Sequence, residues 1–255
     1  MTIGDTAECH SALRGMREVN PITNVVQLRQ LLAERFPHLR FGSERLLARA
    51  APNVWPTGLE QIDNALQGGL PRSAITELTC PKPSSGSALL AFALLRQAHE
   101  SRQWLALVDA MDTFDPARIG EEPFPRFLWV RCRNALQALQ ASDLLLRDGN
   151  LPLVILDLRM NPATELRKVS SATWHRFQRL IETNSTALFV ITPRPLVANA
   201  RARLELTSRF TLAALDKPEE ELLGELKVRL VHQRRLDGHA SPPLAQADEL
   251  IAQAG

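Results

Sequence analysis

Hydrophobic residues along this chain gather into short apolar runs that alternate with segments of helical periodicity. The strand-like runs cover residues 74–79, 104–109, 127–131, 151–157 and 187–192. The run at 151–157 is almost continuously apolar, as a central strand buried on both faces requires. The helical segments cover residues 88–95, 134–147 and 173–183. This alternation predicts an α/β fold with a mostly parallel twisted sheet, right-handed crossovers and helices on both faces.

The chain from residue 193 onward is less regular and rich in arginine. Residues 193–205 are predicted to form an irregular loop, and closing strands are predicted at 208–212 and 226–231. The second strand continues to residue 235 without an acidic residue, which suits a basic edge strand that binds phosphate or an acidic partner, or that guards against edge aggregation. Candidate contacts with DNA or a partner are Arg194, Arg201, Arg203, Lys227, Arg229, Arg234 and Arg235. The loop contains no aromatic residue for base stacking, so solvated charge is the alternative.

Segments on either side of this core carry weaker patterns. Residues 1–23 have no sustained periodicity and are expected to be a mobile lead-in, followed by an N-terminal helical segment over 24–56. One helical stripe in that segment consists of Val25, Leu28, Leu31, Leu32 and Phe36. The core domain is expected over 57–235, and a tail rich in Gly, Pro and Ala over 236–255. The stripe either packs on the core or serves a partner, and the tail is a candidate partner peptide.

The segment between the 74–79 strand and the following apolar helix has the strand–loop–helix order of a phosphate-binding loop. In a P-loop, backbone N–H groups at the helix start surround the phosphates, a Lys reaches the outer phosphates, and a Ser or Thr hydroxyl binds Mg²⁺. Here Ser87 and Ala88 follow Gly86, where the Lys and the hydroxyl are required. Pro81 stands where the first glycine is expected and has no N–H to donate. Taken alone, the loop is better interpreted as an ordinary strand-to-helix turn.

The stretch from residue 57 into the apolar helix resembles the core of RecA recombinases. The matching positions are Thr57, Gly58, Leu59, Ile62, Asp63, Ala65, Leu66, Gly68, Gly69, Leu70, Pro71, Arg72, Glu77, Ser84, Ser85 and Gly86. The resemblance implies a Walker B carboxylate, which Asp157 keeps at the end of its apolar run. It also implies a catalytic Glu where Met111 stands, whose thioether accepts no proton, and a nucleotide-sensing Gln where Pro193 stands. With the Lys and the hydroxyl, four functions of an ATPase site are expected to be lost.

Two residues would preserve part of a nucleotide site. Lys82 lies inside the loop and would bring positive charge to a phosphate from an unusual position. Asp157 would retain the Walker B role, although an Asp at a strand end can equally cap the next turn. The candidate nucleotide contacts of this degenerate loop are therefore Lys82, Ser84, Ser85, Gly86, Ser87 and Asp157.

A RecA-like core with a decayed ATP site resembles the ImuA family of accessory proteins in bacterial SOS mutagenesis. That resemblance implies a non-catalytic scaffold without a cofactor. Its implied partners in translesion synthesis are an ImuB-type inactive relative of Y-family polymerases, an error-prone replicative-type polymerase, and RecA. Two other interpretations stay open. One is a divergent, DNA-stimulated ATPase in which Lys82 and Asp157 keep weak binding of ATP and Mg²⁺, and the other is a SulA-like inhibitor of cell division.

Composition adds limits to these interpretations. The 255 residues include 45% hydrophobic residues, enough for one substantial core and an appendage, and the net charge of +2 argues against a strongly basic nucleic-acid binder. Three dispersed cysteines and six scattered histidines lack metal-binding spacing, so no metal and a reducing cytosol are expected. The sequence shows no secretory signal and no membrane-length apolar run. A bacterial cytoplasmic location, with association with the nucleoid after DNA damage, is expected.

Overall fold

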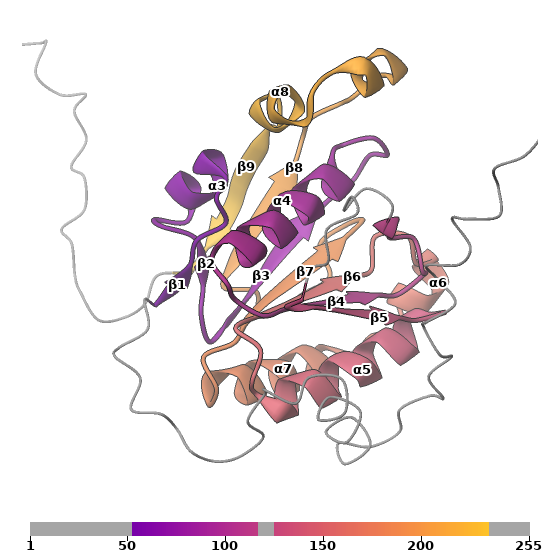
Figure 1. The fold of residues 1–255 in the computed structure, drawn as a ribbon. Helices are drawn as coiled ribbons and strands as arrows, with labels where there is room; N and C mark the ends of the chain where they lie inside the picture. Colours follow the sequence, from indigo (N-terminus) through magenta and orange to yellow (C-terminus); the bar gives the residue numbers. More distant parts are fainter. Residues whose placement is uncertain (1–52, 117–124, 235–255) are drawn as a thin grey trace, which may run out of the picture.

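The computed structural model describes residues 53–116 and 125–234, and its centre is a seven-stranded sheet (Figure 1). In spatial order the strands are β5, β4, β6, β7, β3, β8 and β9. Their bounds are β3 Ala74–Thr79, β4 Leu105–Asp109, β5 Phe127–Arg131, β6 Leu153–Asp157, β7 Ala187–Thr192, β8 Ala202–Leu206 and β9 Val228–Gln233. Neighbouring strands are parallel except β8 and β9, which are antiparallel. The predicted α/β fold with a mostly parallel sheet is confirmed.

Helices cover both faces of this sheet (Figure 1). On one face lie α3 (Glu60–Ala65), α4 (Ser87–Glu100) and α8 (Glu219–Gly224); on the other lie α5 (Ala135–Asp148) and α7 (Ser171–Glu182). The shorter elements are α6 Ala163–Leu166, the 3-10 helix η2 Leu212–Asp216, and the antiparallel pair of β1 Val54–Trp55 with β2 Leu70–Pro71. None of the helices described has the length and hydrophobicity that crossing a bilayer requires.

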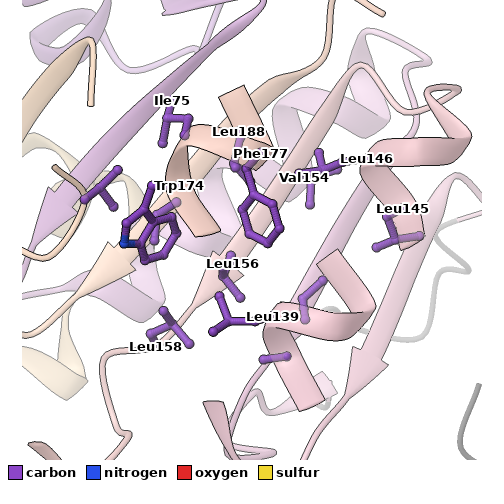
Figure 2. Packing of buried hydrophobic residues seen from close by; sticks show 14 of the residues in the cluster. Ile75, Leu139, Leu145, Leu146, Val154, Leu156, Leu158, Trp174, Phe177 and Leu188 are labelled. Atoms are coloured by element: carbon purple, nitrogen blue, oxygen red, sulfur yellow. The ribbon is translucent and has the colours of Figure 1, made fainter. Parts of the chain in front are cut away.

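The sheet divides the hydrophobic core into two halves, and the side chains of β6 alternate between them. Val154 and Leu156 point into the half that contains α5 and α7, where Phe177 packs (Figure 2). Leu153 and Ile155 belong to the half beneath α4. All four of these β6 side chains are fully buried. Burial on both faces explains why this segment of the sequence is a nearly continuous apolar run.

Local side chains set the ends of several helices. The Asn134 side chain accepts a hydrogen bond from the Gln137 backbone N–H at 2.9 Å, which caps the start of α5. Gly149 ends α5 in the left-handed conformation, with a φ of 72°. Before α3, the Thr57 hydroxyl donates to Asp63 Oδ1 at 2.7 Å and so ties the approaching chain to the helix. The contacts of Asn134 and Gly149 thus set the bounds of α5 by local chemistry.

The structure departs from the expectation in the chain after β7. The strand β8 begins inside the segment that was predicted to be an irregular loop and ends one residue after it, and residues 208–212 form no strand. Ala202, Leu204 and Leu206 are buried, whereas Arg203 and Glu205 between them are partly exposed. This two-residue period is the signature of a strand, but the two charged residues obscure it in the sequence. The closing strand β9 was predicted, although it lies two residues further along the chain than expected.

Several expectations concern parts of the chain that are not described. The lead-in over 1–23, the tail over 236–255 and Arg235 lie outside the described residues. Of the predicted N-terminal helical segment, only residues 53–56 are described, and two of them form β1. Trp55 in β1 is 1% exposed and packs into the core half beneath α4, so this end of the segment is part of the core domain.

Candidate phosphate-binding site

The loop between β3 and α4 carries the residues that a phosphate-binding loop would use (Figure 1). It starts at Cys80 and ends at Gly86, directly before the first residue of α4. Gly86 has a φ of 90° and Ser84 a φ of 56°, so the backbone turns sharply at both positions. The loop follows the carboxyl end of β3, and the carboxyl edge is where parallel α/β sheets bind ligands.

The segment that follows β8 holds this loop in place. Ser208 Oγ donates a hydrogen bond to the Ser85 carbonyl at 2.7 Å, and the Phe210 backbone N–H donates to the Ser84 carbonyl at 2.9 Å. A Cβ atom on Gly86 would lie 2.7 Å from the Phe210 ring, which is too close for van der Waals contact. The protein's own chain therefore fixes the shape of the loop.

Arg159 reaches from the end of β6 to the start of α4. Its Nε lies 3.1 Å from Asp157 Oδ2, and its guanidinium donates a hydrogen bond to the Ser87 hydroxyl. The Arg159 backbone N–H also donates to Asp157 Oδ1 at 3.0 Å. The side chains of Arg159 and Asp157 are only 18% and 9% exposed. Two predicted nucleotide contacts, Ser87 and Asp157, are thus joined by a residue that sequence reasoning missed. The available signal was a basic residue two positions after the strand-end Asp.

Burial shifts the pKa of Asp157 in this ion pair and that of the neighbouring Cys80 thiol. It raises the pKa of Asp157 above its ordinary value, while the charge of Arg159 and the Arg159 backbone hydrogen bond act against that shift. Burial also raises the pKa of the Cys80 thiol to about 12, and the negative charge of Asp157 adds to the increase. At physiological pH Cys80 is therefore a neutral thiol rather than a reactive thiolate.

The residues present do not match the ligand set of a magnesium nucleotide. In P-loop proteins, Mg²⁺ is held through a Ser or Thr hydroxyl at the helix start and a carboxylate at the Walker B position. Ala88 has no hydroxyl, and Asp157 is engaged by Arg159. Within the described parts of the chain, no three His, Cys, Asp or Glu side chains are grouped so that they could hold a metal ion.

No carboxylate occupies the position of the expected catalytic glutamate. Met111 stands there, and Asp109, two residues before it, is the last residue of β4. The Asp109 carboxylate accepts hydrogen bonds from the Phe114 N–H at 2.7 Å and from the Met111 N–H at 3.3 Å. Because Asp109 is 1% exposed and its oxygens bind these backbone groups, it serves as a cap for the turn.

The other predicted loop contacts differ in their exposure. Lys82 and Ser84 are exposed, whereas Ser85 is buried. Lys82 has no hydrogen bond or ion pair with any residue in the part of the chain that the structure covers. The predicted loop cation therefore faces solvent, and the partly buried cation of the site, Arg159, comes from the chain directly after β6.

Among the predicted DNA or partner contacts, Arg203 is engaged inside the fold. Its Nε lies 2.6 Å from Oε2 of Glu77, a fully buried residue of β3. The other Glu77 oxygen accepts hydrogen bonds from Thr192 Oγ1 and from the backbone N–H groups of Leu196 and Val197. Arg203 is thus the counter-ion of a buried carboxylate that anchors the chain leaving β7.

The remaining basic candidates come from the loop after β7 and from the β9 edge of the sheet. Arg201 is partly buried, which lowers the pKa of its guanidinium. Arg229 forms an ion pair with Glu205 across β8 and β9. The exposed members of the set are Arg194, Lys227, Arg229 and Arg234. Their contact with DNA or with a partner stays a prediction.

A pocket of about 610 Å³, which no sequence pattern indicated, lies between α3, α4 and α8 beside β9. Arg96 and Gln97 line it from α4, and Leu226 lines it from the chain before β9. Arg96 pairs with Glu219 at 3.5 Å and with Glu220 at 4.0 Å, so the charges near the pocket are partly matched. Its walls come from distant parts of the chain, which is why only the folded structure reveals it.

The chain is similar to RecA proteins. It is 28% identical to RecA of Methylococcus capsulatus over 205 residues, which are 78% of this chain and 58% of that protein. It is 31% identical to RecA of Leifsonia xyli over 170 residues, which are 60% of this chain and 46% of that protein. With RecA of Deinococcus radiodurans it shares 36% identity over 107 residues, which are 41% of this chain and 29% of that protein. No family model matches the chain.

These similarities, together with the mostly parallel sheet, support membership of the RecA-like superfamily. In these comparisons the chain spans between 29% and 58% of the length of the curated relatives. The similarity between this chain and RecA proteins therefore concerns their core fold.

Proposed function

We propose that this RecA-like chain is a non-catalytic adaptor of the ImuA type in damage-induced mutagenesis and translesion DNA synthesis. In this role it links an ImuB-type inactive relative of Y-family polymerases with an error-prone replicative-type polymerase, and with RecA. It acts through protein contacts in the bacterial cytoplasm, on the nucleoid after DNA damage. The observation that carries the proposal is a RecA-like core in which Arg159 engages Ser87 at the start of α4 and Asp157 at the end of β6.

The chemistry of phosphoryl transfer supports the non-catalytic assignment. Enzymes of this kind position the nucleotide with a loop cation, a metal ion and a residue that activates the attacking water. In this chain Ser87, Ala88 and Met111 stand at the positions where those three functions are expected. Asp157 alone retains its residue type, and its carboxylate is paired with Arg159.

Exposed apolar side chains support a role in protein contact. Large hydrophobic residues that are at least one-third exposed are found at the β9 edge and near the carboxyl end of the sheet. They include Leu230 and Val231 on β9, which are 37% and 49% exposed, and Leu136 at the start of α5, which is 66% exposed. Exposed apolar side chains that gather in a contiguous patch mark surfaces that bind other proteins.

The first experiment measures nucleotide binding. A fluorescent ATP analogue is titrated with Mg²⁺ into the wild-type protein and into Asp157→Ala, and phosphate release is followed with and without single-stranded DNA. The adaptor proposal predicts no saturable binding up to high micromolar concentrations of the analogue and no release of phosphate. Saturable binding that Asp157→Ala abolishes, followed by phosphate release that single-stranded DNA stimulates, would overturn the proposal in favour of a divergent ATPase.

The second experiment measures partner binding with purified components. The full chain should bind an ImuB-type protein, and the double substitution Leu230→Ser and Val231→Ser should weaken that binding. A matched control replaces Arg147, an exposed residue of α5 whose side chain pairs with Asp143. Absence of binding to the ImuB-type protein, together with binding to a cell-division GTPase, would instead identify a SulA-like inhibitor.

A further inference from the structure

We infer that Arg159 is a built-in cation that takes the place of both the P-loop lysine and the magnesium ion, so that the loop holds its shape without a ligand. A P-loop lysine would project from position 87, and Mg²⁺ would lie between the helix start and the Walker B carboxylate. The Arg159 guanidinium connects these two places, because it contacts Ser87 on one side and Asp157 on the other.

The Asp157 carboxylate requires a cation at this place. Asp157 is only 9% exposed, and a buried carboxylate without a counter-charge is strongly disfavoured. Asp109 lies opposite Asp157 in the pairing of β4 with β6 and adds a second negative charge beside it. Lys82 is exposed to solvent, so the internal cation available to Asp157 is Arg159.

The geometry of Arg159 suits this bridging role better than a lysine would. A guanidinium is planar and carries five N–H donors, so one side chain can donate a hydrogen bond to Ser87 while its charge lies beside the Asp157 carboxylate. Its backbone N–H also donates to Asp157 Oδ1 at 3.0 Å, which keeps the carboxylate facing the side chain. Arg159 therefore joins the end of β6 to the start of α4, two elements that a bound metal nucleotide would otherwise connect.

The loop has further supports that do not depend on a ligand. Ser208 and Phe210 hold the carbonyl groups of Ser85 and Ser84 from the side of β8. Together with the Arg159 bridge, these contacts fix the end of the loop that leads into α4. The conformation of the site is consequently set by folding and is not switched by nucleotide. This inference rests on the proposed function in one respect, the absence of nucleotide chemistry.

The test is thermal unfolding of the full chain, with and without an ATP analogue and Mg²⁺. Arg159→Ala should lower the Tm by about 5–10 °C, as expected when one partner of a mostly buried ion pair is removed. Arg159→Lys keeps the charge but cannot span both acceptors, so its Tm should lie between those of wild type and Arg159→Ala. The control Arg147→Ala removes a cation that is 46% exposed and leaves Asp143 paired with Arg176, so it should shift the Tm by less than about 2 °C. Mg²⁺ and the analogue should leave the wild-type Tm unchanged.

A second readout reports on the loop itself. Hydrogen exchange of the backbone amides at 84–88 should become at least about tenfold faster in Arg159→Lys than in wild type, because the bridge to α4 is lost while the protein stays folded. The same amides should be unaffected in Arg147→Ala. Unchanged exchange and an unchanged Tm in the Arg159 variants would overturn the inference.

Stabilisation of the wild-type protein that requires both the ATP analogue and Mg²⁺ would also overturn it, since the metal would then displace Arg159. Failure of the proposed function looks different. If the Arg159 variants behave as expected but the wild-type chain does not bind the ImuB-type protein, the built-in cation stands and the adaptor role falls.

Discussion

Replacing Arg203 by alanine should destabilise the fold, because the substitution leaves the Glu77 carboxylate buried without a cation. The Glu77 side chain is 0% exposed and that of Arg203 is 22% exposed, so water has little access to take over the role of the guanidinium. Removing one partner of a buried ion pair costs about 3–5 kcal/mol. A loss near the lower end, about 3 kcal/mol, is expected because Arg203 is partly solvated and Glu77 keeps its hydrogen bonds from Thr192, Leu196 and Val197.

Urea unfolding followed by circular dichroism measures this loss. With a slope of roughly 2 kcal/mol per molar urea, a loss of about 3 kcal/mol lowers the unfolding midpoint by about 1.5 M. Arg194→Ala, in the exposed part of the loop after β7, is the matched control and should move the midpoint by less than about 0.3 M. Adding Glu77→Gln to Arg203→Ala should recover part of the loss, because a neutral amide needs no counter-ion; the double-mutant cycle gives the coupling.

The opposite result has a definite meaning. If Arg203→Ala unfolds at the wild-type midpoint and also loses binding to single-stranded DNA, Arg203 serves a ligand and its pairing with Glu77 contributes nothing to stability. That outcome would refute the reasoning and restore Arg203 to the candidate DNA contacts.

Two further substitutions test the surroundings of the loop. Gly86→Ala should lower the midpoint of urea unfolding, because Gly86 has a φ of 90° and the added Cβ would lie 2.6 Å from Leu226 and 2.7 Å from Phe210. A midpoint equal to that of the wild type would contradict the described packing. Burial raises the pKa of Cys80 from its ordinary value of 9.0 to about 12. The neutral thiol therefore stabilises the folded state, and this contribution is complete below about pH 9 and is lost as the pH rises toward 12. Cys80→Ala should therefore show a smaller loss of unfolding free energy between about pH 9 and pH 11 than the wild type does, and identical losses would show that the thiol is accessible.

The central part of the fold was predictable because its strands are buried on both faces. Residues such as Val154 and Ile155 point to opposite sides of the sheet, and each side demands an apolar group, so the sequence shows one uninterrupted run. The Asn134 cap and Gly149 likewise set the bounds of α5 by local chemistry that a short window of sequence contains. Such signals need no knowledge of distant residues.

What escaped prediction depends on partners that are far away in the sequence. Arg203 and Glu205 made β8 look like a polar loop, yet each is matched by an opposite charge on a neighbouring strand, Glu77 on β3 and Arg229 on β9. The loop residues were predicted as candidate nucleotide contacts, but Arg159, which contacts Ser87 and Asp157, was not predicted. Arg159 lies 72 positions after Ser87, and only the pairing of the strands brings them together.

The order of strands in the sheet has a consequence for how the chain is made. The strand β3 pairs with β7 and β8, which follow it by more than a hundred residues, so its hydrogen-bonding edges stay unpaired until most of the core domain has been synthesised. Contacts of such long sequence separation slow folding and expose apolar strand edges in the meantime. A fragment that ends before residue 187 would carry β3 without either neighbour, and the β3–α4 loop would lack its contacts with Ser208 and Phe210. The N-terminal half of the core should therefore depend on the C-terminal half to stay soluble while it folds.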